Sequence, residues 1–233
     1  QALADAGLFE RCAEAWDRAA DLTTGTERHA HRRRAAEAWL YAGRIDHGLD
    51  LLERIAGKTG LRVAKNRYLA LAQTVWQRIL LRLRGFSTRP RALSDIPARE
   101  LERLATLRAV TIAYTTLDQI RGAMIHARWL RAALDAGHIE DARLALAFEG
   151  GLAAVSSSPR GRDLALKALS VLPAATVGGA TEFWPLVVTT LWAALNDGQA
   201  SSSVLARRLD GMLEAEGATL SPTHHSLAHF AIG

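Results

Sequence analysis

The chain has 233 residues and a net charge of +5, and 49% of its residues are hydrophobic, which is ample for a core. Its single cysteine, Cys12, excludes an internal disulfide and is typical of a reducing compartment, so we expect a cytoplasmic protein. No apolar run approaches the roughly 20 residues that a membrane-spanning helix needs. The modest positive charge permits nucleic-acid binding but does not favour it over other partners.

The composition favours helix along the whole chain. Alanine, leucine and arginine are abundant, β-branched and aromatic residues are scarce, and there are only six prolines. We therefore predict an all-α fold without a β-sheet. Because a helix–turn unit begins directly after Gln1, we interpret the chain as an interior or C-terminal fragment of a larger protein.

The N-terminal part predicts helical hairpins with turns at Gly7 and Gly43. Helices are expected over residues 8–22, 27–42 and 46–56. A glycine between two helical patterns indicates a C-terminal cap, where the backbone enters the left-handed region that a Cβ disfavours. Five residues after each glycine stands a small residue, Cys12 or Gly48, which would let the two helices approach closely. We expect Cys12 to be a buried structural thiol, since no base is identifiable near it.

A long helix is predicted next, over residues 66–85, with its apolar side facing the core. The residues on that side are Leu69, Val75, Trp76, Ile79, Leu80 and Leu83. An irregular stretch over residues 86–97 should follow, and Pro97 should open another helix over residues 98–116.

Residues 125–150 give the clearest hairpin, with a turn at Gly137. We expect Ala142 to pack on the preceding helix and Arg143 to lie on the exposed side. A weaker unit surrounds Gly198. Because these glycine turns are unevenly spaced along the chain, the repeats must be degenerate. The predicted organisation is a helical array over residues 1–172, a linker over 173–182, and a further helical pair with a C-terminal tail over 183–233.

No pattern in the sequence predicts a catalytic, cofactor-binding or metal-binding site. The segment GKTG at residues 57–60 looks like the end of a phosphate-binding loop, but Leu52 stands where that loop needs a glycine, and no strand precedes it. We predict a helix-ending loop without ATP affinity. His224, His225 and His229 share helical spacing, but the HExxH pattern is absent, and we interpret them as solvated tail histidines.

The basic segment over residues 78–91 is interpreted as a solvated helix face followed by a loop. An anion or nucleic-acid contact is one alternative, but Phe86 is the only aromatic residue there, and stacking on bases needs more. A membrane-surface helix is another alternative. It conflicts with the prediction that Trp76, Ile79 and Leu83 belong to the core.

The glycine spacing resembles the tetratricopeptide repeat, and four longer segments carry a further resemblance. They are RRRAAEAWLYAGRIDHGLDLLERI, RILLRLRGF, LERLATLRAVTIAYTTLDQIRGAMIHARWLRAALDAG and ARLALAFEGGLAA. They resemble the helical tail of large bacterial serine/threonine protein kinases that carry a predicted ATPase module and tetratricopeptide-like repeats. The resemblance covers residues 3–172 and includes no kinase signature.

This resemblance implies an α-solenoid of degenerate tetratricopeptide-like helical hairpins that serves as a non-catalytic, regulatory scaffold. In such repeats the first helix of each pair lines a concave groove for a peptide or protein segment. The residues this places on the groove wall are Arg33, Glu37, Tyr41, Arg131 and Asp135, although ordinary surface positions would explain them equally well. The alternative is the helical tail of an ATP-dependent transcription regulator that binds an effector or nucleic acid. The sequence predicts neither the ligand nor the oligomeric state.

Overall fold

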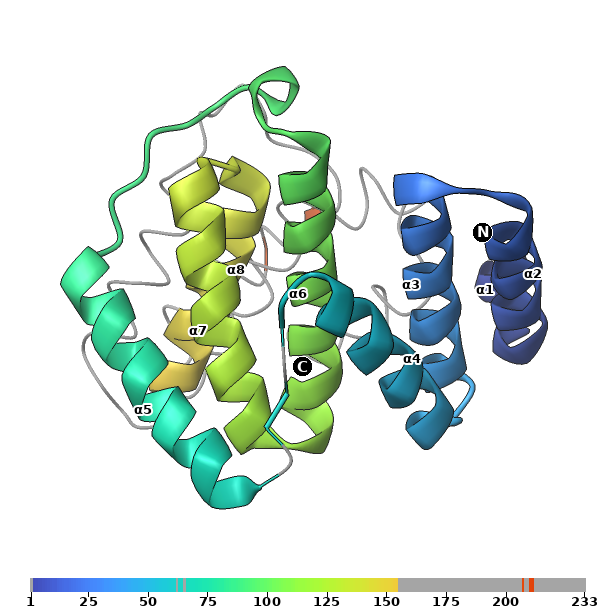
Figure 1. The fold of residues 1–233 in the computed structure, drawn as a ribbon, viewed down its shortest axis with the longest axis horizontal. Coiled ribbons are helices and arrows are strands. Elements are labelled where there is room, and N and C mark those ends of the chain that lie inside the picture. Colours follow the sequence, from blue (N-terminus) through green and yellow to red (C-terminus); the bar gives the residue numbers. More distant parts are fainter. Residues whose placement is uncertain (1, 62, 65, 155–206, 208–209, 212–233) are drawn as a thin grey trace. The chain divides into compact units, whose positions relative to one another are not determined.

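The computed structural model describes residues 2–61, 63–64, 66–154, 207 and 210–211, and Figure 1 shows their arrangement. Every regular element of this part of the chain is helical, which confirms the predicted all-α class. None of its helices has the length and apolar character needed to cross a lipid bilayer. The chain forms two compact units, Gln1–His138 and Ile139–Gly233. The predicted linker, the last helical pair and the turn at Gly198 lie outside the described residues.

The first unit contains seven α-helices and a short 3-10 helix. They are α1 (Ala2–Asp5), α2 (Phe9–Leu22), α3 (Gly25–Tyr41), α4 (Ile45–Lys58), α5 (Arg67–Arg84), η1 (Leu93–Asp95), α6 (Ala98–Leu117) and α7 (Gln119–Ala136). The second unit begins with α8 (Ile139–Ala154). Consecutive helices pack together in the pairs α2–α3, α3–α4 and α6–α7, and α6 also contacts α3 and α4.

Helix α5 departs from this sequential packing. Its main contact is with α7, which lies between α5 and α6 (Figure 1). In a regular solenoid each hairpin contacts its neighbours in sequence. The placement of α5 therefore interrupts the solenoid order that the sequence predicted.

The predicted glycine turns are present in the structure. Gly7, Gly43 and Gly137 have φ angles of 74°, 79° and 71°, in the region that a Cβ disfavours. The small residue predicted to allow close helix approach is also confirmed at Gly48, where an added Cβ would lie 2.6 Å from the Leu40 side chain.

A small apolar core joins α2 and α3. Cys12 is buried there with Ala13 and Ala38, and Trp16 and Trp39 pack against the cluster. The prediction of a buried thiol is confirmed. Small side chains at the centre allow the helices to approach, while the two large indole rings cover the periphery.

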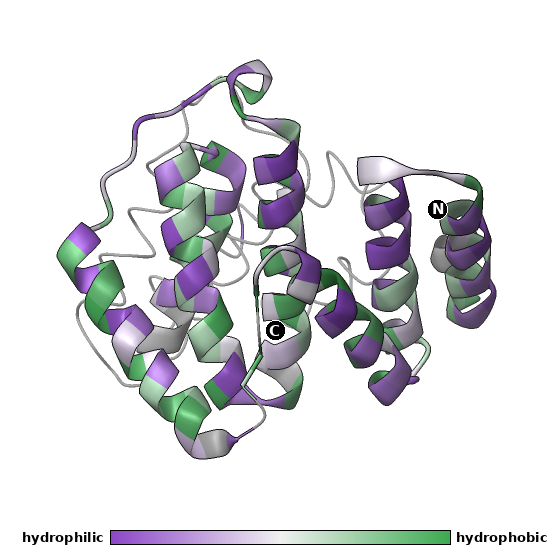
Figure 2. Cartoon of the chain, in the orientation of Figure 1, coloured by the Kyte–Doolittle hydropathy of each residue, from purple (hydrophilic) through white to green (hydrophobic). Residues whose placement is uncertain are grey.

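The predicted orientation of the long helix is wrong. The side of α5 that faces α7 carries Ala70, Thr74 and Leu81, and the Thr74 hydroxyl donates a hydrogen bond to the Ile120 carbonyl of α7 at 3.2 Å. The side predicted to be core is largely exposed: Leu69, Val75, Trp76, Ile79 and Leu83 are all among the exposed residues. Figure 2 shows hydrophobic segments along α5. The pattern locates the apolar side of a helix, but it cannot say whether another element covers that side.

The expected exposure of Arg143 is also wrong. Ala142 is buried as predicted, but the neighbouring Arg143 is only 1% exposed. Within residues 140–150, the less buried positions of α8 are Glu140, Leu144 and Phe148, which recur every four residues along one side, and Arg143 lies off that side.

Candidate functional site

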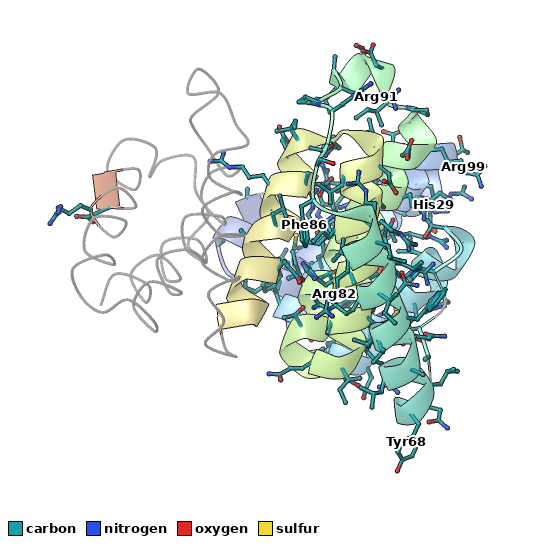
Figure 3. All side chains as sticks on the ribbon, turned by 90° about the vertical axis from the view of Figure 1, so that its left-hand side faces the viewer. His29, Tyr68, Arg82, Phe86, Arg91 and Arg99 are labelled. Carbon is teal, nitrogen blue, oxygen red and sulfur yellow. The ribbon has the colours of Figure 1, made fainter. Side chains whose placement is uncertain are left out.

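A pocket of about 460 Å³ lies beside the beginnings of α3 and α6 and the end of α4. Its ionisable lining combines basic side chains, His29 on α3, Lys58 on α4, and Arg99 and Arg103 on α6, with the carboxylates of Glu100 and Glu102 on α6. Figure 3 labels His29 and Arg99, which lie on the same side of the unit. The N-terminal ends of α3 and α6 add positive potential here and the C-terminal end of α4 adds negative potential, while Lys58, Arg99 and Arg103 outnumber the carboxylates of Glu100 and Glu102 by one.

The GKTG segment contributes to this pocket in an unexpected way. As predicted, it ends a helix: α4 stops at Lys58, and Gly60 has a φ of 78°. The Thr59 hydroxyl donates to the Ala56 carbonyl at 2.9 Å, which closes the last turn. Lys58 and Thr59 nevertheless line the pocket, so the segment presents a cation without forming a phosphate-binding loop.

The predicted residues Arg33 and Glu37 form an ion pair at 3.5 Å on α3. The Arg33 side chain is only 14% exposed, and its buried Nε has no hydrogen-bond partner in the structure. Burial raises the pKa of Glu37, and the charges of Arg33 and of Arg108 on α6 oppose that shift. Because the charge of Arg108 on α6 affects the pKa of Glu37, the side of α3 that carries Arg33 and Glu37 lies toward α6. We call these two residues the polar stripe of α3.

Glu102 on α6 connects this stripe to the pocket that it helps to line. Burial raises the pKa of its carboxyl group, while the charges of Arg33 and His29 oppose the shift. Its buried Oε1 also lacks a hydrogen-bond partner in the structure.

Arginines of α7 extend the basic character beyond the pocket. Burial lowers the pKa of Arg128, and the nearby charges of Arg103 and Arg131 lower it further. Arg128 thus lies near Arg103 of the pocket lining and also near Arg131, one of the predicted groove residues. Guanidinium groups that repel one another in this way would be stabilised by an anion placed among them.

The remaining predicted residues lie in other surroundings. Tyr41 is 58% exposed and packs on Phe9 of α2, with ring centroids 5.5 Å apart. Asp135 forms an ion pair with Arg84 of α5 at 2.6 Å. The structure therefore does not gather all five predicted residues at one place. The pocket contains two residues that the sequence analysis did not select, Arg99 and Arg103. Their spacing of four residues in a predicted helix would have indicated that they lie on the same side of it.

Comparisons with protein families, curated proteins and solved structures found no match for this chain. In the part that the structure describes, the protein is all-helical and has a pocket with a net excess of basic residues in its first unit. Fold and pocket define its class only this broadly. Within that part no three His, Cys, Asp or Glu residues are grouped so that they could hold a metal ion. His224, His225 and His229 lie outside it.

The raised pKa of Glu37 gives a testable dependence of stability on pH. A carboxyl whose pKa is higher in the folded state adds stability below its unfolded pKa of about 4.3, and this contribution disappears as pH rises through the folded value. Glu37→Gln, which resembles the neutral form, is therefore expected to maintain or raise the free energy of unfolding at pH 7, by no more than about 1 kcal/mol. It should also flatten the change in stability over the acidic range.

Urea unfolding of both proteins across that range measures this effect. Glu14→Gln is the matched control, because Glu14 forms an exposed ion pair of the same spacing with Arg18. A marked loss of stability in Glu37→Gln at pH 7 would show that the ion pair with Arg33 outweighs burial.

Proposed function

We propose that this chain is a non-catalytic scaffold whose basic pocket beside α3, α4 and α6 binds an acidic segment of a partner protein. The observation that carries the proposal is an excess of cations at one pocket, where Lys58, Arg99 and Arg103 outnumber Glu100 and Glu102, and Arg128 of α7 lies near Arg103. Opposite charges across an interface steer association and suppress wrong partners.

The wider context of this scaffold is part of the same proposal. The helical hairpins with glycine turns support a degenerate tetratricopeptide-like array. The sequence resemblance supports a regulatory segment of a bacterial serine/threonine kinase with an ATPase module, acting in the cytoplasm. In this proposal the catalytic activity belongs to other domains of the parent protein, and the present segment determines which partner the parent protein binds.

A nucleic acid is the second candidate ligand, because arginine clusters also bind phosphates. It corresponds to the alternative of a transcription regulator's helical tail. The two ligands differ in salt dependence, since binding to nucleic acid releases condensed counterions and weakens steeply as salt rises.

Fluorescence anisotropy with a labelled oligoglutamate peptide and a labelled single-stranded oligonucleotide of equal charge tests both candidates. We expect the peptide to bind with an affinity that falls as salt rises, because its contacts are charged, but less steeply than nucleic-acid binding would. Arg99→Glu together with Arg103→Glu should weaken it at least about tenfold, because like charges then meet in the pocket. Arg18→Glu, on the exposed face of α2, is the control and should leave affinity unchanged. Tighter, steeply salt-dependent binding of the oligonucleotide would favour the nucleic-acid candidate, and no binding of either probe would refute the proposed pocket.

A further inference from the structure

Helix α5 presents a row of large apolar side chains to solvent, on the side opposite α7. We name this row the α5 apolar face, and it consists of Leu69, Val75, Trp76, Ile79 and Leu83. Spacings of three, four and seven residues place these side chains along one side of the helix. Their exposed fractions run from 42% at Ile79 to 80% at Leu83. At 1.5 Å per residue, the face extends over about 21 Å from Leu69 to Leu83.

Exposed apolar residues are concentrated on this helix. Of the thirteen large hydrophobic side chains exposed in the described part of the chain, seven belong to α5, because Tyr68 and Leu71 are exposed as well. Single exposed hydrophobic residues are ordinary, whereas a contiguous row on one helix marks an interaction surface.

The orientation of α5 is fixed by contacts on its other side. Leu81 is 2% exposed, and the Thr74 hydroxyl lies 2.8 Å from the Ala70 carbonyl of its own helix and 3.2 Å from the Ile120 carbonyl of α7. At the C-terminal end of the helix, Arg84 forms its ion pair with Asp135 of α7 at 2.6 Å. These contacts hold the side of α5 with Ala70, Thr74 and Leu81 against the protein and direct the opposite side outward.

The sequence segment that contains α5 is basic, although Arg84 is paired with Asp135 of α7. Residues 58–94 contain nine lysines and arginines and no aspartate or glutamate. Arg82 is exposed on α5 itself, and Arg89 is exposed in the loop that follows. In Figure 3, Tyr68 projects from one end of α5 and Arg82 lies toward the other end. A partner for this face must combine an apolar interior with a negative surface.

We propose that the α5 apolar face docks on an anionic lipid surface, with its leucine, isoleucine, valine and tryptophan side chains in the acyl–headgroup boundary and the neighbouring arginines on the headgroups. Tyr68 and Trp76 combine an apolar ring with a polar atom, which suits the membrane–water boundary. Aliphatic and aromatic residues on one side with basic residues around them define interfacial helices. The sequence analysis set aside a membrane-surface helix because it assigned Trp76, Ile79 and Leu83 to the core. All three side chains are exposed in the structure.

Co-sedimentation of the full chain with lipid vesicles tests the proposal. We expect binding to phosphatidylcholine vesicles that contain phosphatidylserine to exceed binding to phosphatidylcholine alone by at least about tenfold, because each basic residue near the surface adds attraction to anionic lipid. Trp76→Gln together with Leu83→Gln should reduce binding to the anionic vesicles at least about tenfold, since both side chains lose their apolar contact. Arg82→Glu should reduce it without altering the apolar face.

Two controls make every outcome decisive. Leu22→Gln removes a leucine that is 88% exposed on α2 and should leave vesicle binding unchanged. Size-exclusion chromatography with light scattering reports whether the face instead joins two copies of the chain. Absence of vesicle binding, equal binding to neutral vesicles, binding unaffected by the α5 variants, or a dimer dissociated by Trp76→Gln with Leu83→Gln would each overturn the proposal.

Discussion

Gly137→Ala is expected to lower the free energy of unfolding by about 2–5 kcal/mol, for two separable reasons. Gly137 ends α7 with a φ of 71°, where an alanine is strained. In addition, a Cβ at this position would lie 2.3 Å from the Arg89 carbonyl oxygen and 3.0 Å from the Arg91 side chain. That carbonyl is held in place, because the Arg91 N–H donates to the Gly137 carbonyl at 3.0 Å and the Thr88 hydroxyl donates to the Leu134 carbonyl at 2.8 Å.

Gly43→Ala separates these two contributions in urea unfolding experiments. Gly43 has nearly the same φ, 79°, but no atom lies within 4 Å of an added Cβ. Its substitution should therefore cost only the backbone strain, about 1–2 kcal/mol. If both variants lost the same stability, the loop at Arg89 would be yielding freely, and the close approach to Gly137 would contribute nothing.

The comparison of these glycines shows which part of the fold the sequence could predict. A left-handed turn depends on the residue itself and its immediate neighbours, so Gly7, Gly43 and Gly137 were identified correctly. The opening of α6 after Pro97 is local in the same way. The close approach of Arg89 to Gly137 joins residues far apart in sequence, and no local pattern could indicate it.

The pocket was beyond sequence reasoning for the same physical reason. Its basic lining comes from three helices, with His29, Lys58 and Arg103 brought together only by packing. Arg33 and Glu37 were selected by resemblance to a repeat, and the structure places them against α6, where charges on both helices shift the pKa of Glu37. Helical spacing specified which residues share a side, but not which helix would face that side.

Trp129→Ala is expected to lower the free energy of unfolding by about 3–5 kcal/mol, among the largest effects of any single truncation in the first unit. Trp129 is fully buried on α7, together with Ile125 and Leu130, and α7 packs against both α5 and α6. Removing the indole ring leaves a cavity beside α7, the helix that packs against both α5 and α6. Because the surrounding helices can collapse only partly into that space, most of the lost packing is not recovered.

Trp76→Ala is the matched control, with the same residue type on α5 but a side chain that is 57% exposed. It should lower the free energy of unfolding by less than half as much as Trp129→Ala, because more than half of its surface stays in water in the folded state. Urea unfolding of the two variants beside the wild type measures the difference directly. A loss in Trp76→Ala as large as that in Trp129→Ala would mean that the folded chain already covers the α5 apolar face. That face would then have no free surface to offer a lipid bilayer, whereas a small loss leaves it open for docking.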